Sequence, residues 1–149
     1  KMFSLNFKAP IKLTLALFPK LENGLIINIS SLADRFPDGL YSCSKAALIL
    51  YFEALATENR RLRVINVLPS YVDTPMLRSL HNDDKDFSWG QTNRPEQIAE
   101  FVGYVVENPT EIESGSRVVV VSSAQDDGDY DPEKLWLFIT DKRKLTRLK

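Results

Sequence analysis

The sequence has no glycine-rich turn. Its six glycines stand at positions 24, 39, 90, 103, 115 and 128. They form neither G-x-G-x-x-G nor G-x-x-x-G-x-G. Turns of this kind present backbone N–H groups to the phosphates of a dinucleotide. These 149 residues therefore lack the usual phosphate-binding element of dinucleotide-binding folds.

Cysteine, histidine and long apolar runs are scarce as well. Cys43 is the only cysteine, which excludes a disulfide within the chain and leads us to expect a reducing compartment, the cytoplasm. Because no apolar run reaches the length of about 18 residues that a membrane helix needs, no membrane span is expected. His81 is the only histidine and has only scattered acids beside it, so we expect no metal site.

Neither sign of charge dominates the chain. It contains 19 Lys and Arg against 20 Asp and Glu, which gives a net charge of −1. A nucleic-acid-binding protein usually carries a marked basic excess, so no nucleic-acid partner is expected. The length of 149 residues is sufficient for one domain with a hydrophobic core.

The pattern of apolar residues predicts alternating helices and strands. Helices are expected at residues 5–20, 41–60, 75–80 and 95–107, and strands at 25–29, 63–68 and 117–121. This β–α–β–α–β series implies an α/β fold, with a parallel sheet, right-handed crossovers and flanking helices. In such sheets, ligands bind outside the carboxyl ends of the strands.

The chain is expected to divide into a domain at residues 1–123 and a tail at 124–149. The tail contains a cluster of four acids: Asp126, Asp127, Asp129 and Asp131. They lack the twelve-residue pattern and final glutamate of a calcium loop, so we interpret them as a solvated acidic loop. An amphipathic helix is expected at residues 132–149.

Tyr41 and Lys45 are the strongest chemical signal in the sequence. Four residues apart, they lie on one face of the predicted helix 41–60. The ammonium charge stabilises the phenolate, so the phenol donates its proton more readily near neutral pH. A pair of serines, Ser30 and Ser31, ends the preceding strand. A hydroxyl delivered from this strand end would complete a site that polarises a carbonyl.

Four motifs together resemble the short-chain dehydrogenases/reductases. They are Leu5-Asn6-Phe7-Lys8-Ala9-Pro10, Ile26-Ile27-Asn28-Ile29-Ser30-Ser31, Tyr41-Ser42-Cys43-Ser44-Lys45 and Pro69-Ser70-Tyr71-Val72-Asp73-Thr74. They occur in the family's order and at plausible spacings, and the resemblance runs from about Leu5 to Val121. It implies the catalytic second half of an NAD(P)-binding Rossmann fold.

The resemblance implies a catalytic role for four residues. Tyr41 would be the general acid or base, Lys45 would assist it, and Ser31 would donate a hydrogen bond to the carbonyl of the substrate. Asn6, on the preceding helix, would hold a water near the lysine. The implied substrate is a small molecule with a carbonyl or a secondary alcohol.

The resemblance also implies NAD or NADP as the coenzyme. Tyr41 and Lys45 would bind the nicotinamide ribose. The segment after the second predicted strand would touch the nicotinamide through Pro69, Ser70, Val72 and Thr74, with Val72 contributing its backbone.

The chain departs from the family in three ways. The segment from Ser31 to Tyr41 is somewhat short, and Ser70 replaces the usual glycine, which changes the freedom of the backbone modestly. The third departure is the largest, because the glycine-rich first half of the family's fold is missing from this sequence.

Each proposed site residue also has a purely structural interpretation. Ser31 could cap the loop that follows it, and Thr74 before Pro75 has the form of a helix N-cap. Asn6 could cap the helix at 5–20. We expect Thr74 to act both as a cap and as a coenzyme contact.

Two functions remain open from the sequence. One is an NAD(P)-dependent oxidoreductase of which this chain is the catalytic portion; the other is a non-catalytic remnant that acts as an interaction or regulatory module. The serine–tyrosine–lysine set favours the first, and the missing glycine-rich turn favours the second for the chain alone.

The family resemblance implies a homo-oligomer that is formed through helices 5–20 and 41–60. An exposed sheet edge at residues 25–29 would favour association as well. The candidate contact residues are Leu48, Tyr51, Phe52 and Leu55.

Overall fold

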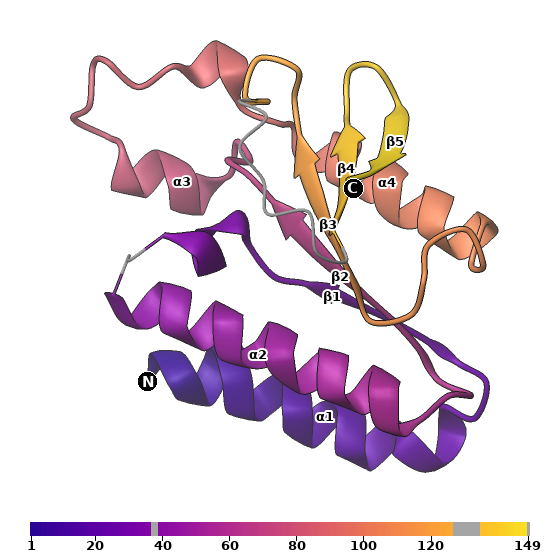
Figure 1. Cartoon of the computed structure of the whole chain (residues 1–149). Helices are drawn as coiled ribbons and strands as arrows, with labels where there is room; N and C mark the ends of the chain where they lie inside the picture. Colours follow the sequence, from indigo (N-terminus) through magenta and orange to yellow (C-terminus); the bar gives the residue numbers. More distant parts are fainter. Residues whose placement is uncertain (37–38, 127–134, 149) are drawn as a thin grey trace.

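The computed structural model describes residues 1–36, 39–126 and 135–148 (Figure 1). Its strands are β1 (Leu25–Ile29), β2 (Arg63–Pro69), β3 (Ser116–Val121), β4 (Leu135–Ile139) and β5 (Lys144–Arg147). Its α-helices are α1 (Ala9–Leu17), α2 (Gly39–Glu58), α3 (Pro75–Leu80) and α4 (Pro95–Glu107). Short helical turns occupy Ser4–Lys8, Phe18–Lys20, Leu32–Arg35 and Trp89–Gln91.

The described strands form one five-stranded sheet in the order β1-β2-β3-β4-β5. The first four strands are parallel, and β5 is antiparallel to β4. The α/β fold expected from the sequence is therefore confirmed. β1 lies at an edge, and Ile29 at its end is 46% exposed. The strand is consequently less buried than its continuous apolar run predicts.

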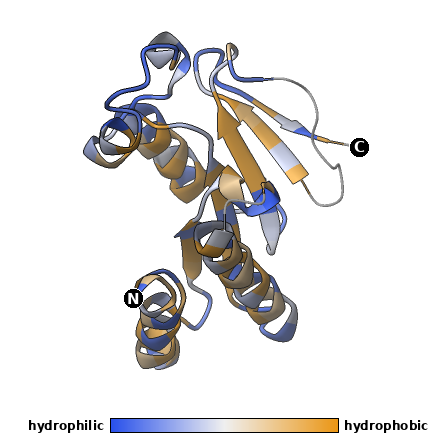
Figure 2. Cartoon of the chain, turned by 90° about the vertical axis from the view of Figure 1, so that its left-hand side faces the viewer, coloured by the Kyte–Doolittle hydropathy of each residue, from blue (hydrophilic) through white to orange (hydrophobic). Residues whose placement is uncertain are grey.

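Helices cover both faces of the sheet (Figure 1). Phe101 and Val105 of α4 pack against Ile65 of β2 on one face. On the other face, α2 packs against the sheet through two groups of residues: Leu48, Phe52 and Leu55 near Val64, and Ile49 near Leu68 and Val119. Figure 2 shows apolar residues concentrated along the strands between these helices.

The helix predicted at residues 132–149 is wrong. Residues 135–139 and 144–147 are strands that continue the sheet. Alternation along β4 places Leu135 and Leu137 in the core beside α2, and Phe138 in the core beside α4. A continuous apolar run suits a strand that is buried on both faces, whereas an amphipathic helix would leave a polar face. Apart from Asp126, the predicted acidic loop lies outside the described residues.

The helix predicted at residues 5–20 is present but has three parts. A π-helical turn, Ser4–Lys8, precedes α1, and the Ala9 N–H donates to the carbonyl of Ser4. Pro10 follows and has no N–H to donate to the carbonyl four residues earlier, which accounts for the local departure from α-helical bonding. Asn6 lies within this turn and is not its cap.

Three of the four residues expected in an oligomer contact are buried inside the chain. Leu48, Phe52 and Leu55 are at most 8% exposed and pack with Phe7 and Ile11 of the first helical segment. Their side chains are therefore used within the fold. In the part of the chain that the structure describes, no helix is both long enough and apolar enough to cross a membrane.

Candidate active site

Tyr41 and Lys45 lie at the start of α2, as their spacing predicts. The Lys45 Nζ is 5.6 Å from the centroid of the Tyr41 ring. Lys45 is half-buried, and this burial lowers its pKa. Cys43 is exposed between them and does not share their face. The geometry brings a phenol and an amine together at one end of α2.

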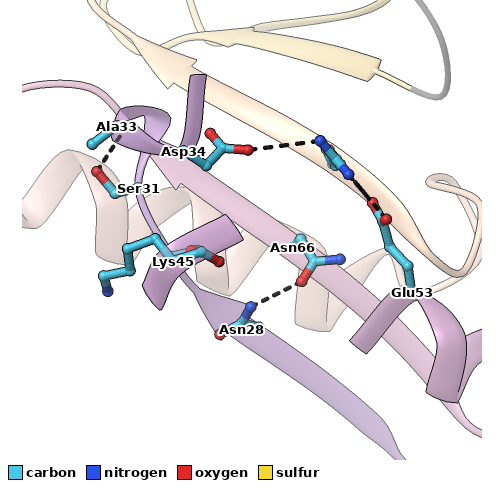
Figure 3. Close-up of polar contacts among 9 residues, drawn as sticks. Asn28, Ser31, Ala33, Asp34, Lys45, Glu53 and Asn66 are labelled. Atoms are coloured by element: carbon cyan, nitrogen blue, oxygen red, sulfur yellow. Dashed lines mark hydrogen bonds and ion pairs between the residues drawn. The ribbon is translucent and has the colours of Figure 1, made fainter. Parts of the chain in front are cut away.

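The serine pair ends β1 beside α2. The Ser30 N–H donates to the carbonyl of Val67 at 2.8 Å, and its Oγ donates to the carbonyl of Lys45 at 3.5 Å. These bonds join the end of β1 to both β2 and α2. Figure 3 shows Ser31 and Lys45 on these two neighbouring elements.

Ser31 also caps the turn that follows it. Its Oγ accepts a hydrogen bond from the Ala33 N–H at 3.1 Å (Figure 3). The structural interpretation of this serine is therefore confirmed. The cap uses a lone pair of the hydroxyl, which has an O–H to donate as well. Capping is thus compatible with a hydrogen bond to a substrate carbonyl.

Asn6 contacts the first turns of α2. Its Nδ2 donates to the Ser44 Oγ at 3.2 Å, and that hydroxyl donates to the carbonyl of Tyr41 at 2.7 Å. The interpretation of Asn6 as a helix cap is wrong. Ser44 is fully buried and links the π-helical turn to the backbone of the tyrosine.

The segment after β2 is fixed by a residue that the sequence did not reveal. Asn93 is fully buried, and its Nδ2 donates to the Ser70 Oγ at 2.9 Å. Its backbone pairs with Val72, accepting from the Asp73 N–H at 2.8 Å. The only sequence signal was an amide residue just before a predicted helix, which suggests a local cap rather than a long-range contact.

Thr74 is the N-cap of α3. Its Oγ1 accepts from the Leu77 N–H at 3.3 Å, which confirms the expected cap. Among the described residues, no hydrogen bond joins Ser31 to Tyr41 or Lys45 to Thr74. These parts of the site are held at one edge of the sheet by their strands and helices, because the carboxyl ends of β1 and β2 lie side by side.

A partly buried charged cluster joins the turn after Ser31 to α2. The Arg117 guanidinium binds Glu53 through two bonds, Nε–Oε1 at 2.5 Å and Nη2–Oε2 at 3.0 Å. Its Nη1 is 3.6 Å from Asp34 Oδ2. The Asp34 side chain is only 4% exposed. Burial raises the pKa of this carboxyl, and the charge of Arg117 opposes the rise.

A family model described as short chain dehydrogenase matches residues 1–85. An acetoacetyl-CoA reductase of Acinetobacter sp. is 33% identical, over 68% of this chain and 46% of that protein. The human dehydrogenase/reductase SDR family member 4 is 31% identical, over 80% of this chain and 49% of that protein. The chain thus spans about half the length of these curated relatives.

Solved structures share the fold. An oxidoreductase from E. coli, yciK, superposes with a TM-score of 0.69 and 25% identity, covering 83% of this chain and 50% of that one. The 3-alpha-hydroxysteroid dehydrogenase of Pseudomonas sp. B-0831, solved with NADH, gives 0.68 at 18% identity, with coverages of 78% and 63%.

The family model covers more than half of the chain, and its match includes the serine pair, Tyr41 and Lys45. The relatives and the parallel sheet agree with it. The chain therefore belongs to the short-chain dehydrogenase family.

Proposed function

We propose that the protein containing this chain transfers hydride between a nicotinamide coenzyme and a carbonyl or secondary alcohol. The observation that carries the proposal is the placement of Lys45 Nζ 5.6 Å from the Tyr41 ring at the start of α2. The serine pair at the end of β1 is bonded to the same stretch of helix. A phenol, an amine and a hydroxyl are thus gathered where ligands bind in parallel sheets.

Each side chain has a defined task in this proposal. During reduction, Tyr41 donates its phenolic proton to the oxygen of the carbonyl, and in the reverse direction the phenolate removes it. The Lys45 ammonium stabilises that phenolate. Ser31 donates its O–H to the same oxygen while its lone pair still caps the turn. Asn6 supports the tyrosine backbone through Ser44.

The residues of this chain fit the nicotinamide end of a coenzyme. The Tyr41 hydroxyl and the Lys45 ammonium would hold the ribose hydroxyls, and the segment from Pro69 to Thr74 would border the ring. When bound, the coenzyme supplies or accepts the hydride. The pyrophosphate would need a glycine-rich turn, which the 149 residues do not contain.

The names of relatives suggest a first substrate to test. One is an acetoacetyl-CoA reductase, and another, from Chlamydia trachomatis, is a 3-oxoacyl-[acyl-carrier-protein] reductase at 36% identity. Both names describe the reduction of a 3-oxoacyl thioester. We propose such a carbonyl as the starting compound, with NADH and NADPH tested in parallel. The presence of Tyr41, Lys45 and Ser31 together does not favour a non-catalytic remnant.

Coenzyme measurements test this function. We expect the isolated 149 residues to bind NADH and NADPH weakly in a fluorescence titration, because no helix N-terminus after a glycine-rich turn receives the pyrophosphate. The native protein should consume one of the two with acetoacetyl-CoA or a related carbonyl. Micromolar binding by the isolated residues would contradict the proposal that they hold only the nicotinamide end of the coenzyme. Native protein that binds coenzyme but consumes none with any carbonyl would contradict the function.

We also propose a homo-oligomer that uses the outer faces of α1 and α2. Leu13 and Leu15 of α1 and Leu50 of α2 are more than half exposed, whereas the inner leucines are buried. Large apolar side chains gathered on a surface favour association.

Light scattering at tens of micromolar should give a dimer or larger species. The double variant Leu13→Lys, Leu50→Lys should shift the equilibrium toward the monomer. A wild-type chain that is monomeric at this concentration would refute the proposal.

A further inference from the structure

Arg117 joins two elements that are distant in sequence. One partner, Asp34, belongs to the turn Leu32–Arg35 directly after Ser31. The other, Glu53, belongs to α2. The guanidinium comes from a third element, the start of β3. A single side chain therefore contacts both the turn next to the proposed catalytic serine and the helix that carries the proposed acid and amine.

The stripe of α2 that faces the sheet contains Glu53 as well as the site residues. Tyr41, Lys45, Ile49 and Glu53 follow one another at intervals of four. Each residue of this series lies beside the next on the helix surface, about 40° further round the axis. Ile49 is fully buried against the sheet, so the stripe points inward. Fixing Glu53 therefore restrains the rotation of α2 about its axis, and with it the direction of Tyr41 and Lys45.

The buried carboxylate of this cluster, Asp34, is costly to remove from water. Asp34 is 4% exposed, and its Oδ1 is a buried acceptor without a hydrogen-bond partner among the described residues. Two carboxylates share one guanidinium, and well-packed apolar residues of similar size are often at least as stable as such a group. Stability is therefore a weak explanation for these charges, whereas fixed geometry is a strong one: the fork of an arginine sets both distance and angle.

We propose that Arg117 is a positioning residue, which sets Ser31 relative to Tyr41 and Lys45 by holding Asp34 on one side and Glu53 on the other. Its meaning for catalysis rests on the function proposed above. In Figure 3, the dashed lines drawn from Asp34 and from Glu53 end on the same guanidinium.

The contacts of Arg117 with Asp34 and Glu53 form a clamp between the turn and α2. Amide hydrogen exchange tests this clamp without any assay of activity. The turn contains protected amides, because the N–H groups of Ala33 and Phe36 donate to Ser31 Oγ and to the Ala33 carbonyl. In Arg117→Met, we expect exchange across residues 31–36 to accelerate about tenfold or more, which corresponds to about 1.4 kcal/mol of lost protection. Exchange in α4 should stay unchanged.

A matched control separates the clamp from the general loss of an arginine. Arg147 on β5 also binds a glutamate through two bonds, to Glu113 at 3.1 Å each, at an exposed position. Arg147→Met should leave residues 31–36 as in the wild type. Equal acceleration in both variants, or no acceleration in Arg117→Met, would overturn the proposal.

A variant that removes only one of the two contacts of Arg117 covers the case in which Arg117→Met does not fold. Asp34→Asn keeps the pair of Arg117 with Glu53 and should loosen the turn alone. Exchange across residues 31–36 that is unchanged in Asp34→Asn would contradict the clamp.

Kinetics on the native protein give a second, independent measurement. Arg117→Met should lower kcat about 10- to 100-fold through misplacement of the serine and tyrosine, with little change in KM for the coenzyme. Arg117→Lys should recover part of the loss, because an ammonium can pair with one carboxylate but not hold both. If the native protein is inactive but the turn still loosens, the proposed function fails and the clamp stands. A variant with normal kcat and a loosened turn would show that the clamp does not position the site.

Discussion

Tyr41→Phe should lower the turnover of the native protein at least about 100-fold, the usual range for a lost acid–base group. The change removes one oxygen from a half-buried ring at the start of α2 and leaves the helix intact, so the loss should appear in kcat. Steady-state rates of coenzyme consumption measure it.

Tyr51→Phe is the matched control for this experiment. Tyr51 lies on the same helix, packs edge-on against Phe52 at 5.4 Å, and belongs to the cluster beside α1. Its substitution should leave turnover near that of the wild type. A Tyr41→Phe enzyme with near-normal turnover across pH would refute the catalytic assignment, whereas an equal loss in both variants would indicate damage to α2 itself.

Phe101→Ala should destabilise the chain by about 3–5 kcal/mol, the range for a large aromatic side chain lost from a core. Phe101 is fully buried on α4, and its ring centroid lies 4.5 Å from that of Phe138 on β4. The substitution opens a cavity between α4 and the sheet. Since domains of this kind unfold with only about 5–15 kcal/mol, much of the stability should disappear. Urea unfolding measures the loss.

Val106→Ala provides the control on the same helix. Val106 is 57% exposed, so its substitution should change the free energy of unfolding by less than about 0.5 kcal/mol. A small effect of Phe101→Ala would contradict the packing of β4 against α4. It would also reopen the question of how the tail is arranged, because Phe138 is the part of β4 that contacts this ring.

Local signals allowed much of the fold to be predicted. Pro95 and Glu96 mark the start of α4, and the run from Leu25 to Ile29 gives β1 with its observed bounds. The run from Leu135 to Ile139 has the same continuous apolar character as β1. The sequence nevertheless predicts a helix there, because the pairing of this run with β3 cannot be inferred from the tail itself.

The parts of the site that were missed depend on long-range contacts. Tyr41 and Lys45 are recognisable because four residues on a helix fix their relation. Arg117 and Glu53 are 64 residues apart, and their pairing follows only from the placement of α2 over β3. The role of Asn93 likewise depends on its bridge to Val72. No local pattern distinguishes Arg117 or Glu53 from a surface charge, and none distinguishes Asn93 from a helix cap.

The transfer of a labelled hydride tests the central claim most directly. The native protein would be mixed with a carbonyl substrate and reduced coenzyme that carries deuterium on one face of the nicotinamide C4, each face in turn. Mass spectrometry would then locate the label in the alcohol. The account predicts deuterium on the former carbonyl carbon for one of the two faces, formed much more slowly by Tyr41→Phe. An alcohol without deuterium from either face, or equal rates in the wild type and Tyr41→Phe, would contradict it.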